Sequence, residues 1–343
     1  MRKFILEENL HEKSNADRHE SEDDPFTVYS SHIENPFHHF VDLRQSIKDK
    51  ISRNEIFYSF EIVSVKKPKT FYERLLLDMD KYSPLFYALT WHNEETSSND
   101  SYLPLDLVKN FPSNTLLHLA AKDLKRDEVV RILKEALACG IINIFALQGD
   151  SLFEDGDFKY AEDLVAFIRK EFGDTFCIGV AGYPQMHPKS LSKELDLYYL
   201  KAKVEAGADF IITQICFESQ VFIKFVKDCR NIGIEVPILP GILAPMNYEC
   251  LEKMTDICKL EVPIEIKDDL ARIKDDNQAV RKFVIDLTVK IITDVIKSGT
   301  TCGFHLFTLN RTGSCTPIAA PERRAWTAHA RSDRACARRR AWR

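Results

Sequence analysis

Short apolar or aromatic runs alternate along the chain with longer stretches of helical periodicity. Eight such runs occur, at residues 56–63, 85–91, 115–121, 142–148, 176–183, 210–217, 236–242 and 303–309. They are apolar nearly throughout, which is typical of parallel strands that are buried on both faces. The sequence predicts helices between them, at residues 125–139, 159–172, 190–206, 220–231, 248–259 and 277–297, and a leading helix at residues 35–50.

Eight strand–helix units predict an α/β fold, a single-domain (β/α)8 barrel of the TIM type. A doubly wound sheet is the alternative, but it would usually carry Gly-x-Gly-x-x-Gly after its first strand, and the sequence has no such motif. We expect the barrel to span residues 36–311. The polar, acidic segment 1–35 is expected to be a flexible, disordered tail, and the Arg- and Ala-rich segment 312–343 a basic, irregular and disordered one.

Charge and cysteine content narrow the class of protein. A net charge of −5 and a pI near 6.1 give no electrostatic reason to expect a nucleic-acid partner. No apolar run has the roughly 18 residues of a membrane span, and the N-terminus lacks the apolar core of a signal peptide. The nine cysteines form no Cys-x-x-Cys pair and fall mostly in apolar segments. We therefore expect reduced thiols in a cytoplasmic protein without a membrane partner.

Polar residues recur where the predicted strands end, which is where the active site of a (β/α)8 barrel lies. The residues within or directly after the strand ends include Glu61, Thr90, Trp91, His92, His118, Gln148, Gly149, Asp150, Tyr183, His187, Gln214, Asn310 and Arg311, most of them polar. A ring of such residues from separate strands indicates a shared pocket. The histidines and aspartates lack the spacing of metal ligands, such as His-x-x-x-His, so we expect no metal.

Each of these residues also has a purely structural interpretation. Glu61 lies within an apolar strand, where it is either a member of an ion pair or an acid whose pKa is raised by burial. Asp150 follows Gly149 and either caps the next helix or reaches a ligand. His118 fits a hydrogen-bonded core histidine as well as a site residue, and Gln214 needs partners for its amide in either place. The residues by themselves leave these alternatives open.

Nine short blocks of the sequence carry a resemblance to a known family. In chain order they are SFEIV, LTWH, LLHLAAK, FALQGD, GVAGYPQMHP, EAGADFIITQICFE, VPILPGI, LEVPIEIKDDL and GFHLFTLNR. In these blocks the chain resembles the catalytic domain of methylenetetrahydrofolate reductase in its eukaryotic form, over about residues 36–311. The family is a (β/α)8 barrel that holds FAD without a Rossmann fingerprint. The resemblance implies that NADPH (or NADH) reduces 5,10-methylenetetrahydrofolate to 5-methyltetrahydrofolate through FAD, in ping-pong order, in one-carbon metabolism and methionine supply.

The resemblance also implies roles by position. Glu61 matches the acid that protonates the folate nitrogen, and Asp150 matches the carboxylate that orients the pterin and tunes the flavin. Positions that contact FAD in the family are Thr90, Trp91, His118, Gln148, Gly149, Asp150, Tyr160, Ala161, Tyr183, His187, Pro188, Lys189, Ser190, Asp196 and Lys203. Positions on the folate side are Glu61, Asp150, Gln214, Phe307 and Arg311. The dimers and tetramers of the family make a homodimer possible.

Three departures from the family pattern support an alternative. The first acid is followed by Ile62-Val63-Ser64-Val65 where the family has Phe-Phe-Pro-Pro, Gln148 replaces an arginine, and Phe307 replaces a tyrosine. An amide at position 148 cannot supply the charge of a guanidinium to FAD. The alternative is a catalytically impaired barrel that binds folate or a partner protein without turnover. Nothing in the chain resembles the regulatory domain of eukaryotic relatives, which binds S-adenosylmethionine.

Overall fold

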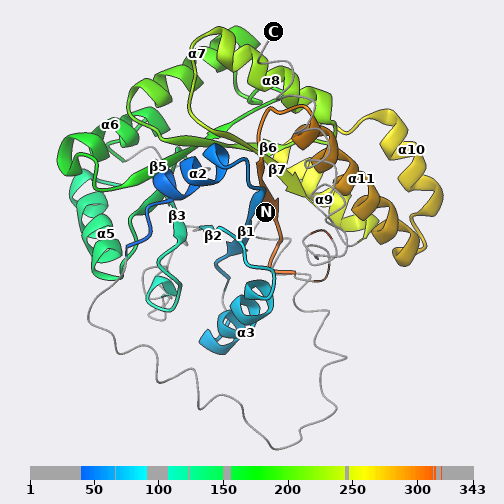
Figure 1. The fold of residues 1–343 in the computed structure, drawn as a ribbon, viewed down its shortest axis with the longest axis horizontal. Helices are drawn as coiled ribbons and strands as arrows, with labels where there is room; N and C mark the ends of the chain where they lie inside the picture. Colours follow the sequence, from blue (N-terminus) through cyan, green and yellow to red (C-terminus); the bar gives the residue numbers. More distant parts are fainter. Residues whose placement is uncertain are drawn as a thin grey trace, which may run out of the picture.

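Eight parallel strands close into a barrel in the computed structural model (Figure 1). The structure describes residues 40–65, 67–90, 107–122, 124–149, 156–243, 247–311, 313 and 318. The strands follow one another round the barrel in chain order, and β1 pairs with β8 to close it. The predicted (β/α)8 barrel is confirmed. The segments predicted as tails lie outside the described residues, apart from positions 313 and 318.

The strands are short and largely buried. They are β1 (Phe57–Val63), β2 (Phe86–Thr90), β3 (Thr115–Ala120), β4 (Asn143–Leu147), β5 (Cys177–Gly182), β6 (Phe210–Ile215), β7 (Ile238–Leu243) and β8 (Gly303–Phe307). Each overlaps one of the predicted apolar runs, with ends that differ by up to two residues. Every residue of β1, β2 and β7 is buried, as expected for a parallel sheet that is covered on both faces.

Helices surround the barrel (Figure 1). They are α2 (Leu43–Ser52), α3 (Lys69–Asp80), α5 (Arg126–Ala138), α6 (Ala161–Phe172), α7 (Lys193–Glu205), α8 (Ser219–Asn231), α9 (Tyr248–Cys258), α10 (Ile264–Ile273) and α11 (Asn277–Lys297). The helices α3 and α10 occur in addition to the predicted set. The leading helix begins at Leu43, later than predicted, because the Asp42 carboxylate accepts the Arg44 N–H and caps it. None of the described helices has the length and apolar character that a membrane crossing requires.

The barrel interior is filled at its amino-terminal end. Alternate residues of each strand point inward, so one set of side chains meets inside the sheet. This interior cluster includes aromatic residues of four strands and two aliphatic residues of α2, namely Phe57, Phe86, Phe145, Phe210, Leu43 and Ile47. A second, larger cluster lies between the sheet and the surrounding helices. The helix α2 therefore covers one end of the barrel, and the carboxyl ends of the strands form the other.

Asn143, the buried first residue of β4, fastens α2 to the barrel. Its Oδ1 accepts the Leu43 N–H at 2.9 Å, and its Nδ2 donates to the Val41 carbonyl at 2.9 Å and to the Thr115 carbonyl at 3.3 Å. The first N–H groups of a helix have no partner within the helix, so this amide satisfies one of them away from water. One side chain thus joins two strands and the helix that covers them.

We predict that Asn143→Ala lowers the free energy of unfolding by about 3 kcal/mol, because it leaves a buried N–H and a buried carbonyl without partners. Urea unfolding followed by circular dichroism measures this. Asn231→Ala, at an exposed position of α8, is the matched control and should change stability by less than about 0.5 kcal/mol. Equal stability of the two variants would contradict the role given to Asn143.

Candidate active site

Glu61 faces the inside of the barrel near the carboxyl end of β1. Its neighbours Phe60 and Ile62 belong to the cluster between the sheet and the helices, whereas Ala88, its partner on β2, belongs to the interior cluster. The Glu61 side chain is only 2% exposed. It lies towards the end of the barrel where (β/α)8 enzymes place their reacting groups.

The two oxygens of the Glu61 carboxyl have different surroundings. Oε1 accepts a hydrogen bond of 2.8 Å from the Thr90 hydroxyl at the end of β2. Oε2 is buried and has no hydrogen-bond partner among the described residues. Burial raises the pKa of Glu61 to about 7, and the Thr90 hydrogen bond opposes that rise. A carboxyl with this pKa exists in both protonation states near neutral pH, as a proton donor in catalysis requires.

The segment after β8 holds the end of β1 by side-chain hydrogen bonds. Thr308 Oγ1 donates to the Glu61 carbonyl at 2.6 Å. The Asn310 amide accepts the Val63 N–H at 2.8 Å and donates to the Val63 carbonyl at 2.7 Å. Asn310 has a φ of 60°, a left-handed conformation that asparagine adopts more readily than most residues. These bonds continue the pairing of β1 with β8 beyond Phe307, so the backbone on both sides of Glu61 is fixed.

Two histidines lie inside the barrel. The Nδ1 atom of His305 lies 2.8 Å from the Ser59 hydroxyl, two residues before Glu61 on the same face of β1. Burial lowers the pKa of His305 to about 3, so its ring is neutral. His118 of β3 packs against the Phe145 ring, with centroids 4.8 Å apart. His305 therefore adds no positive charge at neutral pH that would favour ionisation of Glu61.

The loop after β4 brings its backbone close to β3. Gly149 has a φ of +94°, and a Cβ atom there would lie 3.1 Å from the Ala120 Cβ, so both conformation and space favour glycine. Gln148 Nε2 donates to the Lys159 carbonyl at 2.9 Å. The side chain that replaces the arginine of the family pattern is thus bonded to the chain before α6.

Lys203 of α7 is a partly buried cation near the carboxyl end of β5. Its Nζ donates to the Ala181 carbonyl at 2.6 Å. Burial lowers the pKa of Lys203 to about 8, and nearby Asp196 opposes this. Burial raises the pKa of Asp196, while the backbone N–H of His187 counteracts this by hydrogen bonding to its carboxylate. An ammonium group has three donors, so Lys203 has capacity for an anionic oxygen besides the carbonyl.

The remaining described residues among the predicted FAD contacts lie at the start of α6 and in the loop before α7. The Tyr160 ring is about half exposed and stacks on Tyr199, with centroids 6.4 Å apart. Tyr183 packs edge-on against His187, with centroids 4.5 Å apart. The others are Ala161, the first residue of α6, and the loop residues Pro188, Lys189 and Ser190.

Besides Glu61, the described residues predicted for the folate side lie on β6, on β8 and directly after β8. Gln214 Oε1 accepts the N–H of Ile215 at 2.9 Å, so its carbonyl oxygen is engaged locally. The Phe307 ring packs edge-on against His305 at a centroid distance of 4.7 Å. Arg311 follows β8, and its N–H bonds to the backbone of that turn. Within the described residues, no three His, Cys, Asp or Glu side chains gather in a way that could hold a metal ion.

The predicted site residues meet in two groups of direct contacts. The first is Glu61 with Thr90. The second comprises Tyr183, His187, Lys189, Ser190 and Asp196, and the charge of Asp196 also acts on Lys203. Trp91, His92 and Asp150 lie outside the described residues, so the roles predicted for Trp91 and Asp150 stay predictions.

Sequence reasoning missed Ser59, His305 and Thr308. A signal for the first two is present in the alternation of strand residues. Ser59 precedes Glu61 by two positions, and His305 precedes Phe307 by two, so each shares an inward face with a predicted site residue. The contact between Ser59 and His305 could thus have been predicted, because both are polar residues on the inward faces of neighbouring strands. Thr308 carries no such signal, because it follows the strand.

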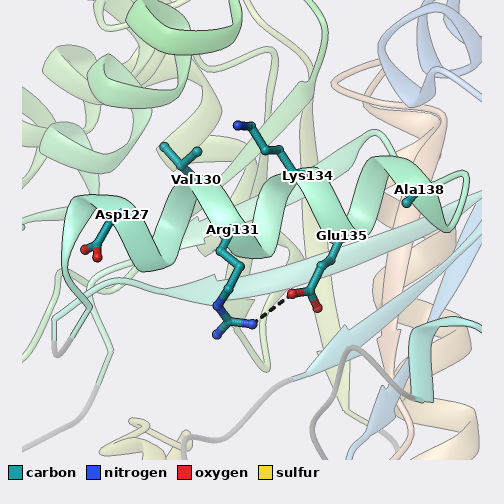
Figure 2. Close-up of a pocket in the computed structure, with 6 residues that line it drawn as sticks. All are labelled: Asp127, Val130, Arg131, Lys134, Glu135 and Ala138. Atoms are coloured by element: carbon teal, nitrogen blue, oxygen red, sulfur yellow. Dashed lines mark hydrogen bonds and ion pairs between the residues drawn. The ribbon is translucent and has the colours of Figure 1, made fainter.

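A separate hollow lies on the outer surface of α5 (Figure 2). Its lining residues all come from this one helix: Asp127, Val130, Arg131, Lys134, Glu135 and Ala138. Arg131 and Glu135 form an ion pair of 2.9 Å across one turn. No predicted site residue contributes to it, and an exposed pair of this type is common on helix surfaces. The hollow is therefore not the candidate active site.

The fold and the buried acid define a (β/α)8 barrel that carries polar groups at the carboxyl ends of its strands. Residues 46–321 match the family model described as methylenetetrahydrofolate reductase. The chain therefore belongs to the methylenetetrahydrofolate reductase family.

Similar curated proteins agree with this family. The chain is 36% identical over 293 residues to a probable methylenetetrahydrofolate reductase (NADPH) of Caenorhabditis elegans, covering 82% of this chain and 44% of that protein. It is 34% identical over 287 residues to methylenetetrahydrofolate reductase (NADH) 1 of Arabidopsis thaliana, covering 77% and 48%. The chain thus spans about half the length of the curated relatives it matches.

A solved structure shares the fold at low sequence identity. It is an uncharacterised protein from Clostridium thermocellum described as binding two copies of 5-methyl-5,6,7,8-tetrahydrofolic acid. The TM-score is 0.58 at 14% identity, and the match covers 82% of this chain and 99% of that one. At this identity the similarity supports the fold alone.

The raised pKa of Glu61 predicts a pH dependence of stability. The folded-state pKa of about 7 exceeds the ordinary value of 4.5, so between these values the folded protein holds more protons than the unfolded chain. The free energy of unfolding then falls as pH rises through this window, by about 3 kcal/mol in total. Glu61→Gln should remove this contribution, which urea unfolding at a series of pH values measures.

Glu235→Gln, at an exposed position before β7, is the matched control for this experiment and should keep the wild-type pH dependence. A Glu61→Gln profile parallel to that of the wild type between pH 5 and pH 8 would mean that Glu61 has an ordinary pKa.

Proposed function

We propose that this barrel reduces 5,10-methylenetetrahydrofolate to 5-methyltetrahydrofolate, with NADPH or NADH as reductant and FAD as the carrier in a ping-pong sequence. The observation that carries the proposal is the buried Glu61 carboxyl, which occupies the position of the family's acid and has a pKa near 7. Family membership and the names of the relatives support it. Both reductants occur among those names, so the proposal includes either.

The described residues fit FAD. Gly149 permits a close approach of the backbone, and Lys203 is a partly buried cation suited to the diphosphate. The residues proposed to hold FAD are Thr90, Trp91, His118, Gln148, Gly149, Asp150, Tyr160, Ala161, Tyr183, His187, Pro188, Lys189, Ser190, Asp196 and Lys203. When bound, the flavin would supply hydride transfer from the reduced nicotinamide to the folate.

The protein would supply orientation and one proton. Glu61 would protonate the folate nitrogen as the five-membered ring opens to an iminium ion. Asp150, outside the described residues, would orient the pterin, together with Gln214, Phe307 and Arg311. The neutral surroundings of Glu61 favour its protonated form, and so favour this role.

Three features favour a second candidate, a barrel that binds folate or a partner protein without turnover. The Gln148 amide is bonded to Lys159 and is uncharged, Phe307 has no hydroxyl, and the buried Ile62 and Val63 replace aromatic residues of the family pattern. We favour the reductase because Glu61, Asp150 and Gln214 are all retained.

We also propose a cellular location, a metabolic role and an assembly for the protein. We infer a cytoplasmic location, which is supported by the seven cysteines of the described residues, all of them free thiols. A role of the protein in methionine supply would follow from its product, because 5-methyltetrahydrofolate is a methyl carrier. A homodimer is the assembly to test by light scattering.

An anaerobic absorbance experiment on the purified chain with FAD tests the function. NADPH or NADH is added first and 5,10-methylenetetrahydrofolate second. We predict that the oxidised-flavin band bleaches with the nicotinamide and returns with the folate, because each substrate completes one half-reaction. Glu61→Gln should keep the bleaching and slow the return by about 100-fold or more, because the proton donor is lost.

Protein that takes up FAD but fails to bleach, or fails to recover the band, would support the impaired barrel. Protein that takes up no FAD would exclude the reductase for this chain.

A further inference from the structure

The Thr90 hydroxyl faces the Glu61 carboxyl and donates its single proton to it in a hydrogen bond. A threonine hydroxyl has one O–H donor and two acceptor lone pairs. In the structure that donor is used for Glu61 Oε1, at 2.8 Å. The backbone of Thr90 is held by its pairing with Val63 and by the Ser64 N–H, which donates to the Thr90 carbonyl. Thr90 is 8% exposed, so the bond is shielded from water.

The same bond distinguishes the two oxygens of the acid. Oε1 is occupied as an acceptor, whereas Oε2 is buried without a hydrogen-bond partner among the described residues. An unpartnered buried oxygen is costly as a carboxylate and is better tolerated when it carries a proton. The acidic proton of Glu61 therefore belongs on Oε2.

We propose that Thr90 is a positioning residue that turns the Glu61 carboxyl so that Oε2 delivers the proton to the substrate. This rests on the proposed function, and deepens the role that the family resemblance gives to Thr90, which is contact with FAD. With its donor committed to Glu61, Thr90 can offer a cofactor only its acceptor lone pairs.

The proton step balances without a further reactant. The Oε2–H bond breaks, an N–H bond forms on the folate nitrogen, and the electron pair stays on the carboxylate. The Thr90 hydrogen bond then stabilises the negative charge that appears on Glu61. Thr90 therefore acts before and after the proton transfer. It orients the Glu61 carboxyl before the transfer and stabilises the carboxylate afterwards.

The elements around Glu61 carry few other titratable side chains. On β8 the titratable side chain is His305, which is neutral, and Arg311 follows that strand. On β3 the titratable residue inside the barrel is His118, and Asp150 after β4 lies outside the described residues. Burial and the Thr90 bond are the two causes acting on the pKa of Glu61 in the structure. Thr90 is thus the group to change.

The test is an infrared titration of the Glu61 carboxyl in the purified full chain, without folate. The band of the protonated carboxyl is assigned by its absence in Glu61→Gln. Thr90→Val removes the donor at nearly constant volume and should raise the midpoint by about one pH unit, a tenfold change in acid dissociation. Thr90→Ser keeps a hydroxyl and should restore the wild-type midpoint. Thr90→Ala replaces the valine variant if that variant does not fold.

Thr115→Val is the matched control. Thr115 is a fully buried strand threonine whose hydroxyl has no hydrogen-bond partner among the described residues, at the other end of the barrel from Glu61. It should leave the midpoint unchanged. An unshifted midpoint in Thr90→Val, or equal shifts in the valine and serine variants or in Thr115→Val, would overturn the proposal.

Measurements of turnover separate this inference from the proposed function. With an active wild type, Thr90→Val should lower kcat for the folate step and move its alkaline pH limb upward with the infrared midpoint, whereas Thr90→Ser should keep the wild-type pH limb. If the wild type shows no reductase activity but the infrared midpoint shifts as predicted, the proposed function fails and the hydrogen-bond assignment stands. If the wild type is active and the midpoint does not move, the positioning role is wrong.

Discussion

The pairing of β1 with β8 is the contact on which the rest of the site depends, because it turns an open sheet into a closed barrel. Without that closure β1 would be an edge strand, and Glu61 would lie beside water. With it, Thr308 and Asn310 bond to the end of β1, and the carboxyl is only 2% exposed. The raised pKa of Glu61 is therefore a consequence of topology, and the chemistry proposed for it depends on residues that are 247 positions away in sequence.

The two ends of the closed barrel differ in structure: one is packed with apolar side chains, and the other carries polar groups. At the amino-terminal end Asn143 and the apolar face of α2 complete the packing of the interior. At the carboxyl end the buried acid of β1 and the partly buried Lys203 of α7 remain, each with capacity for a further partner. Such groups cost stability unless a ligand completes them, which is the usual sign of a binding site. The stable end and the reactive end are thus built from opposite ends of the same strands.

Much of this could be predicted from the sequence. The apolar runs determined the number and order of the strands, since buried parallel strands read as continuous apolar segments. Glu61 stood out because a carboxyl is rare in such a run. The Thr90–Glu61 bond could not be predicted, because it depends on the register of β1 against β2 and on side-chain orientation, which periodicity does not specify. The same holds for Asn310, whose left-handed backbone turns its amide onto Val63.

The central claim is that Glu61 acts as a buried acid in folate reduction. It is tested most directly by the pH dependence of the folate half-reaction, followed as the rate of flavin reoxidation after rapid mixing of reduced enzyme with 5,10-methylenetetrahydrofolate. The account predicts that this rate falls as pH rises through about 7, where Glu61 loses its proton, and that the slow residual rate of Glu61→Gln lacks this limb. A rate that is independent of pH across this range, or the same limb in Glu61→Gln, would contradict it.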